Sequence, residues 1–171
     1  MTTRYGLVAA TVLLATLGVP LAGTAAPTAK AALVPAAAEA TKWQPDATLT
    51  SVSTMSVMPD GTAASWMYAF YSPKTKKFLS VTIKGGKSDS LEVQKGLTDP
   101  VGTDFIDSDK AMQEAKANGL RGKTPSMALT FMGNIKQPTT FWTVTGGFAS
   151  GDVSVILEAK TGKLFSKNPI P

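Results

Sequence analysis

The sequence predicts an α+β fold of two tandem units, each made of one helix and a four-stranded antiparallel meander. Apolar residues alternate along several short segments that are separated by turn residues, as they do on half-buried strands. A capped helical segment precedes the second group of strands, and an Ala-rich segment precedes the first. Trp66 and Trp142 follow these segments at similar distances, and each begins a hairpin with apolar alternation. The agreement between the two halves favours a duplicated unit.

The first unit is predicted over residues 43–98, behind an Ala-rich lead at 26–42. Within this lead, 36–42 reads as the end of a short helix; a plain linker is the alternative, because Ala favours helix whereas short isolated helices are marginal. Trp66, Tyr68 and Phe70 occupy alternate positions, so the three aromatic side chains share one face of the predicted strand. The predicted strands are 47–58, 66–70, 79–83 and 91–93, and the turns between them are 59–62, 72–77 and 85–87.

The second unit is predicted over residues 99–171 and opens with the capped helix. Asp107 or Ser108 is its N-cap, because a short polar side chain can accept a hydrogen bond from a free backbone N–H of the first turn. Asp109 places negative charge at the positive end of the helix dipole, and Gly119 suits the position after the C-cap. The predicted strands are 127–132, 140–145, 153–159 and 164–165, and the turns between them are 133–134, 146–152 and 160–163.

The first 25 residues have the parts of a secretory signal peptide. Arg4 gives the positive start, residues 7–21 form an apolar run too short for a comfortable membrane span, and small residues follow. Cleavage after Ala25 is preferred, cleavage after Ala31 comes second, and an uncleaved N-terminal anchor is the third reading. The absence of cysteine excludes an acylated Cys anchor. We therefore expect a secreted or periplasmic protein without a stable membrane span after cleavage.

The composition removes most familiar catalytic chemistries. The chain has no cysteine and no histidine, which excludes thiol catalysis, thiolate metal sites, the Ser-His-Asp relay and the commonest zinc ligand. A chain of this length buries enough surface to fold without disulfides. We predict a protein that is not an enzyme, with no catalytic residue, no cofactor and no metal site. Removal of Arg4 with the signal leaves a net charge of +4.

Two groups of residues could bind a partner. Trp66 and Trp142 could be interface anchors, but alternating aromatic residues on a hairpin more often pack in the core. Lys74, Lys76 and Lys77 form the densest basic patch, which Lys84 and Lys87 could join. This patch could contact an anionic envelope polymer, a lipid headgroup or an acidic partner, although charged hairpin tips also keep sheets soluble. Nucleic acid is not an expected partner of an exported chain whose aromatic residues do not interleave with basic ones.

Asp104, Asp107 and Asp109 crowd a short stretch that could suggest calcium binding. The stretch lacks the glycine and the distal glutamate of a calcium loop. Helix capping explains Asp107 and Asp109 more simply, so we predict no calcium site here.

The residues 107–119, 142–144 and 155–164 resemble the PepSY or PepSY-like family of exported domains. The matching features are the helix start and its closing glycine, a Trp-Thr-Val strand, and a final strand that ends in a Thr-Gly turn. Glu158 stands where the family usually has Asp, a change that keeps the turn chemistry. The resemblance covers residues 107–165; over 43–95 it rests on the Trp66 hairpin and the Pro-Asp-Gly turn.

The resemblance implies a cystatin-like fold, in which a helix packs across a curved antiparallel sheet, and a non-catalytic role. Related units occur in the propeptides of thermolysin-like proteases, which they are thought to restrain. The expected function is therefore a module that binds, and in one version inhibits in trans, another exported protein such as a peptidase. The alternative is a protein that binds a small ligand or an envelope polymer on the concave sheet face. The sequence leaves the oligomeric state open.

Overall fold

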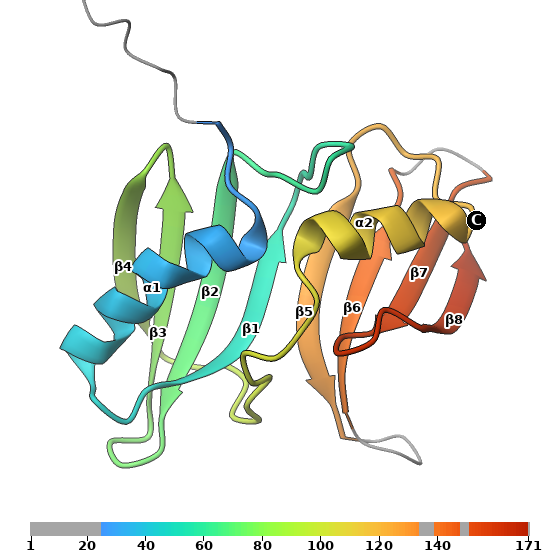
Figure 1. Cartoon of the computed structure of the whole chain (residues 1–171). Helices are drawn as coiled ribbons and strands as arrows, with labels where there is room; N and C mark the ends of the chain where they lie inside the picture. Colours follow the sequence, from blue (N-terminus) through green and yellow to red (C-terminus); the bar gives the residue numbers. More distant parts are fainter. Residues whose placement is uncertain (1–24, 134–138, 148–150, 171) are drawn as a thin grey trace, which may run out of the picture.

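The computed structural model describes residues 25–133, 139–147 and 151–170 of the chain. All of the predicted signal peptide except Ala25 lies outside these residues, as do Asn134 and part of the predicted 146–152 turn. Figure 1 shows the arrangement of the elements. In chain order they are α1 (Ala29–Trp43), β1 (Thr48–Thr54), β2 (Ser65–Ser72), β3 (Lys77–Lys84), β4 (Lys87–Val93), α2 (Ser108–Ala117), β5 (Ser126–Met132), β6 (Thr139–Thr145), β7 (Val153–Glu158) and β8 (Leu164–Pro169).

The prediction of two tandem units was wrong, because all eight strands form one antiparallel sheet in the order β4-β3-β2-β1-β5-β6-β7-β8. β1 and β5 are paired neighbours at its centre, with Ser51 opposite Thr130 and Thr54 opposite Met127. Neither β1 nor β5 contains a charged residue. Sheet edges are normally protected by charged residues, bulges or Pro, and these two strands pair with each other instead of forming two edges.

One hydrophobic core runs across this central junction. Tyr68, Val52, Leu129, Trp142 and Leu157 lie opposite one another on successive strands from β2 to β7. All five are fully buried. Both helices cover this face of the sheet (Figure 1), with α1 against β2, β3 and β4, and α2 against β6 and β7.

α1 begins earlier than predicted, at Ala29 instead of near Ala36, and replaces most of the predicted lead. Ala29, Ala32, Ala36 and Ala40 are buried at helical spacing, so the small side chains let the helix lie close to the sheet. Pro35 is inside the helix but on its exposed side. Contact with the sheet therefore stabilises a helix whose sequence alone suggested an interruption.

α2 agrees with its prediction. Asp107 is the N-cap, and its side chain accepts a hydrogen bond from the Ser108 backbone N–H at 2.7 Å. Gly119 follows the C-cap with a φ of +99°, a conformation that glycine adopts without strain. The Trp66 strand, the 59–62 turn and the strands β3, β5, β6 and β7 also lie within two residues of the predicted positions. Three strands differ more: β1 ends at Thr54 instead of Met58, β4 begins at Lys87 instead of Leu91, and β8 continues to Pro169 instead of ending at Phe165.

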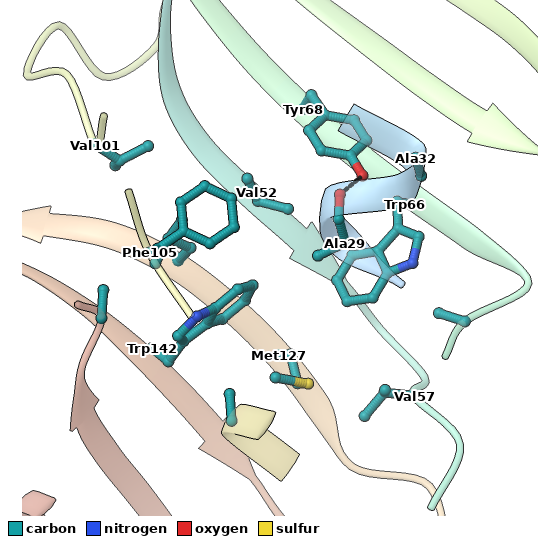
Figure 2. Packing of buried hydrophobic residues seen from close by; sticks show 14 of the residues in the cluster. Ala29, Ala32, Val52, Val57, Trp66, Tyr68, Val101, Phe105, Met127 and Trp142 are labelled. Atoms are coloured by element: carbon teal, nitrogen blue, oxygen red, sulfur yellow. Dashed lines mark hydrogen bonds between the residues drawn. The ribbon is translucent and has the colours of Figure 1, made fainter. Parts of the chain in front are cut away.

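The connection from β4 to α2 completes the core between the two helices. The Val101 backbone N–H donates to the Leu49 carbonyl at 3.0 Å, and the Thr140 hydroxyl donates to the Val101 carbonyl at 3.3 Å. Phe105 packs edge-on against Trp142, with ring centroids 5.8 Å apart. Figure 2 shows Phe105 of this segment between Val52 of β1 and Trp142 of β6. This segment therefore joins the two halves instead of separating them.

No helix in the described ranges is long and apolar enough to cross a membrane.

Candidate functional site

The four central strands of the sheet, β2, β1, β5 and β6, contain no charged residue. One face of these strands is the core described above. The opposite face carries neither α1 nor α2 (Figure 1). We call the residues of these strands that point away from the helices the neutral face. From the strand register they are Thr48, Ser51, Ser53, Ser65, Met67, Ala69, Tyr71, Ser126, Ala128, Thr130, Met132, Thr139, Phe141, Thr143 and Thr145.

Uncharged side chains form rows across the neutral face. In one row Met67, Ser53, Ala128 and Thr143 lie opposite one another on β2, β1, β5 and β6, and Ile156 continues the row on β7. Neighbouring strands are about 4.8 Å apart, so the side chains of a row are in contact range of one extended molecule. All of these residues except Met67 are only partly exposed.

A hollow lies at one end of the neutral face, where β1 ends and β2 begins. Its volume is about 360 Å³. Met55 is 88% exposed and Met67 is 50% exposed, so both thioethers are accessible from solvent. The hollow is lined by Ser53, Thr54, Met55, Ser56, Ala64, Ser65 and Met67.

Aromatic pairs border the neutral face on both sides. Tyr71 contacts Phe78 of β3 with ring centroids 5.0 Å apart, and Phe141 contacts Phe165 of β8 with centroids 4.6 Å apart. Phe141 is buried although it points away from the helices, whereas Phe165 is largely exposed. Phe165 therefore covers one end of the neutral face and offers an apolar ring to a bound molecule.

The two tryptophans that the sequence offered as possible anchors belong to the core. Trp66 and Trp142 are both 0% exposed. Each indole N–H donates to a backbone carbonyl just before a helix: Trp66 to Pro27 at 2.9 Å and Trp142 to Ile106 at 2.9 Å. The preferred structural interpretation is confirmed, and neither residue is accessible to a partner.

The structure places the three lysines of the predicted basic patch at one turn, and the two lysines that could join them at another. Lys74, Lys76 and Lys77 lie at the β2–β3 turn and are exposed. Lys77 forms an ion pair with Glu92 at 3.1 Å, which offsets part of the positive charge. Lys84 and Lys87 lie at the β3–β4 turn, at the opposite end of β3. The first three lysines therefore form a small exposed group, and the two others are not part of it.

The three aspartates of the sequence cluster have separate roles. Asp107 joins both helix starts: Thr28 Oγ1 donates to its Oδ2 at 2.7 Å, and the Lys30 backbone N–H donates to its Oδ1 at 2.9 Å. Asp104 forms an ion pair with Lys160 at 2.7 Å, and this hydrogen bond lowers the pKa of Asp104. Asp109 caps the backbone N–H of Lys110 at 2.6 Å.

The described part of the chain contains no group of three or more acidic side chains that could hold a metal ion.

The sequence prediction missed the neutral face and the hollow at its end, which we call the methionine hollow after Met55 and Met67. The signal was present, because the strands predicted at 47–58, 66–70, 127–132 and 140–145 contain no Asp, Glu, Lys or Arg. A strand face exposed to solvent usually carries some charged side chains, so four successive uncharged strands were a usable signal for this surface.

The sequence matches no protein-family profile, and no curated protein matches it either. Among solved structures, the fold is similar to the crystal structure of a protein from Clostridium difficile 630 that is described as a putative lipoprotein. The similarity has a TM-score of 0.54 at 12% sequence identity and covers 80% of this chain and 91% of that chain. At this identity the likeness shows the fold alone. The PepSY resemblance stays a prediction.

Proposed function

We propose that this protein is an exported, non-catalytic binding protein that docks another exported protein on its neutral face. The observation that carries the proposal is the absence of charged residues from β2, β1, β5 and β6. The centres of protein interfaces are depleted of charged residues in the same way. Export is supported by the signal-like N-terminal sequence and agrees with the description of the structural neighbour.

Covering the neutral face costs little free energy of desolvation. Transfer of a charged side chain out of water is expensive, whereas a hydroxyl can exchange its bond to water for a bond to the partner. Ser51, Ser53, Thr130 and Thr143 offer such hydroxyls near the centre of the face. A partner that presents backbone or other uncharged polar groups fits this surface.

The methionine hollow supplies the apolar anchor that a protein partner needs. Met55 and Met67 are flexible and polarizable, so they can adapt to the shape of an inserted side chain. Ala64 adds a small apolar wall, and the lining contains no charged residue. An apolar or aromatic side chain of a protein partner suits this hollow better than the hydroxyl groups of a sugar do. The PepSY resemblance makes an exported peptidase the first partner to test.

The proposal is tested by placing charge on the neutral face. Ala128→Glu puts a carboxylate at its centre, and Ala38→Glu puts the same group on an exposed position of α1, on the other side of the sheet. A photoreactive residue at position 143 or 38 is used to crosslink partners among the exported proteins, and the captured protein is then purified and its affinity measured. We expect crosslinking from position 143 and loss of affinity in Ala128→Glu but not in Ala38→Glu.

Three outcomes would contradict the proposal. Equal crosslinking from positions 143 and 38 would show no preference for the neutral face. A purified partner that binds Ala128→Glu and the unchanged protein equally would place the interface elsewhere. Binding of a neutral glycan, with loss of that binding in Ala128→Glu and no protein captured, would favour the envelope-polymer alternative. Inhibition assays on a captured peptidase decide whether binding also restrains it.

A further inference from the structure

β4 is an edge strand along which every residue is exposed. It pairs with β3 over its whole length, from Lys84 opposite Lys87 to Phe78 opposite Val93, without a register shift. Its other side has no strand beside it in the described part of the chain. Leu91 is 68% exposed and Val93 is 36% exposed, although both are apolar. A long regular edge of this kind is a template for pairing with another strand.

The turn before β4 indicates which backbone groups are free. Gly85 and Gly86 have φ values of +55° and +75°, as in the two-residue type I′ turn. Such a turn is closed by a hydrogen-bonded pair, here Lys84 and Lys87, and hydrogen-bonded and non-hydrogen-bonded pairs alternate from there. The backbone N–H and C=O groups of Ser88, Ser90 and Glu92 therefore point outward from the sheet.

The other edge of the sheet is protected in ways that β4 is not. β8 has a register shift against β7 between Ile156 and Leu157, and it contains Lys167 and Pro169. Bulges, Lys and Pro all hinder the addition of a further strand. β4 has charged residues of its own, Lys87, Asp89 and Glu92, but it has neither a register shift nor a Pro. Of the two edge strands, β4 is therefore better suited than β8 to pair with another strand.

Of the two acidic residues of β4, Asp89 and Glu92, Glu92 is held by neighbours in its own chain. Trp43 Nε1 donates to Glu92 Oε1 at 2.8 Å, and Lys77 Nζ lies 3.1 Å from Glu92 Oε2. The hydrogen bond from Trp43, followed by that from Lys77, lowers the pKa of Glu92. The charge of Glu92 is therefore balanced within one molecule and does not repel an approaching strand.

We propose that β4 pairs with β4 of a second copy of this chain, antiparallel and centred on Ser90. Ser90 is the middle residue of the strand, and its outward groups would bond those of the other Ser90, while Ser88 would bond opposite Glu92. Asp89 would then lie opposite Leu91, and Lys87 opposite Val93. No two like charges lie directly opposite each other in this register, so a second copy can pair along the whole strand without charge repulsion between opposed residues.

The pairing also covers exposed apolar surface and extends the neutral face. Leu91 and Val93 point to the helix-free side, because they lie opposite Ser80 and Phe78 of β3. Antiparallel pairing about a twofold axis perpendicular to the sheet keeps both helix-free sides on the same side of the dimer. Two copies would therefore present their helix-free surfaces as parts of one continuous sheet.

The test is a charge exchange at the proposed twofold axis. The exported product of the full chain is expected to be a dimer by analytical ultracentrifugation. Ser90→Glu and Ser90→Lys each place like charges about 5.5 Å apart between Cα positions, so each variant alone should be monomeric. An equimolar mixture of the two should form a heterodimer. Ser90→Ala keeps the backbone groups and is the control that should remain dimeric.

Ser90 is exposed in the single chain, so we expect each variant to fold. Thermal melting followed by circular dichroism checks this for each variant. A monomeric parent protein would overturn the proposal, as would a dimer that both charged variants retain. A strand of a different protein bound at β4, with the chain itself monomeric, would overturn it too. Ala128→Glu should leave the dimer intact, so failure here is distinguishable from failure of docking on the neutral face.

Discussion

Adjacent residues of β6 show how differently the two faces of the sheet are built. Trp142 and Val144 point to the helices and are fully buried, whereas Thr143 between them points to the neutral face and stays partly exposed. On the helix-bearing face, large side chains fill the space under α1 and α2. On the neutral face, small hydroxyl-bearing side chains leave the sheet open. Substitutions on the first face should therefore change stability, and those on the second should change recognition.

The largest expected effect is on the helix-bearing face, for Trp142→Ala. Trp142 is fully buried, packs against Phe105 and donates a hydrogen bond to Ile106, so its removal leaves a large cavity and an unpaired carbonyl. We expect a loss of about 3–5 kcal/mol in the free energy of unfolding, measured by urea denaturation. Met67→Ala on the neutral face is the control, with an expected change within about 0.5 kcal/mol. A comparable loss in both variants would break the distinction between the faces.

A smaller effect is expected at the junction of the two helices. Asp107→Ala removes the acceptor for Ser108 N–H, Lys30 N–H and the Thr28 hydroxyl. Because one carboxylate serves both helix starts, we expect a loss of about 2 kcal/mol, at the upper end for a single cap. Thermal and urea unfolding of the variant measure it. Asp109→Ala, which removes a nearby exposed carboxylate of the same helix, should change stability by less than about 0.5 kcal/mol.

Tyr68, on the helix-bearing face, makes the free energy of unfolding depend on pH in the alkaline range. Its hydroxyl donates to the Ala29 carbonyl at 2.7 Å, and burial, followed by the charge of Asp107, raises the pKa of Tyr68. The folded state therefore favours the protonated phenol. The stability that this preference contributes is fully present below the pKa of about 10 that tyrosine has in the unfolded chain. As the pH rises above that value, the free energy of unfolding falls by up to about 1.4 kcal/mol per pH unit.

Tyr68→Phe tests this dependence. Near neutral pH the variant should lose about 1 kcal/mol, because the Ala29 carbonyl loses its donor. Above about pH 10 the difference from the parent protein should shrink, since Phe does not ionise. Urea unfolding of both proteins across this pH range gives the comparison. A difference that stays constant with pH would show that Tyr68 does not titrate with unfolding.

The local elements could be predicted from the sequence, but the joining of the strands could not. The alternation at Trp66 and Phe70 and the cap at Asp107 depend on neighbours in sequence, and both agree with the structure. The pairing of β1 with β5 joins residues such as Ser53 and Ala128, which are far apart in the chain, and no local pattern encodes it. A repeated order of elements therefore predicts two separate units, although the strands share one sheet.

The candidate site was hidden for a related reason. The Thr and Ser residues of each strand were used as signs of strand structure, and their shared face appears only when β2, β1, β5 and β6 are placed side by side. Met55 and Met67 are distant in sequence and meet at the hollow only through the pairing of β1 with β2. Prominent residues of the sequence such as Trp142 are buried and are needed for folding.

The smallest expected effect comes from exchanging Thr and Val at neighbouring positions of β6. Thr143→Val keeps the β-branched shape and removes a hydroxyl from the partly exposed neutral face, so stability should change by less than about 0.5 kcal/mol. Val144→Thr places a hydroxyl in the core and should cost about 1–3 kcal/mol. Urea unfolding of the two variants measures both changes in one strand. If Thr143→Val destabilised the protein as much as Val144→Thr, the hydroxyl of Thr143 would be part of the folded framework, and the neutral face would not be free to use its hydroxyls for a partner.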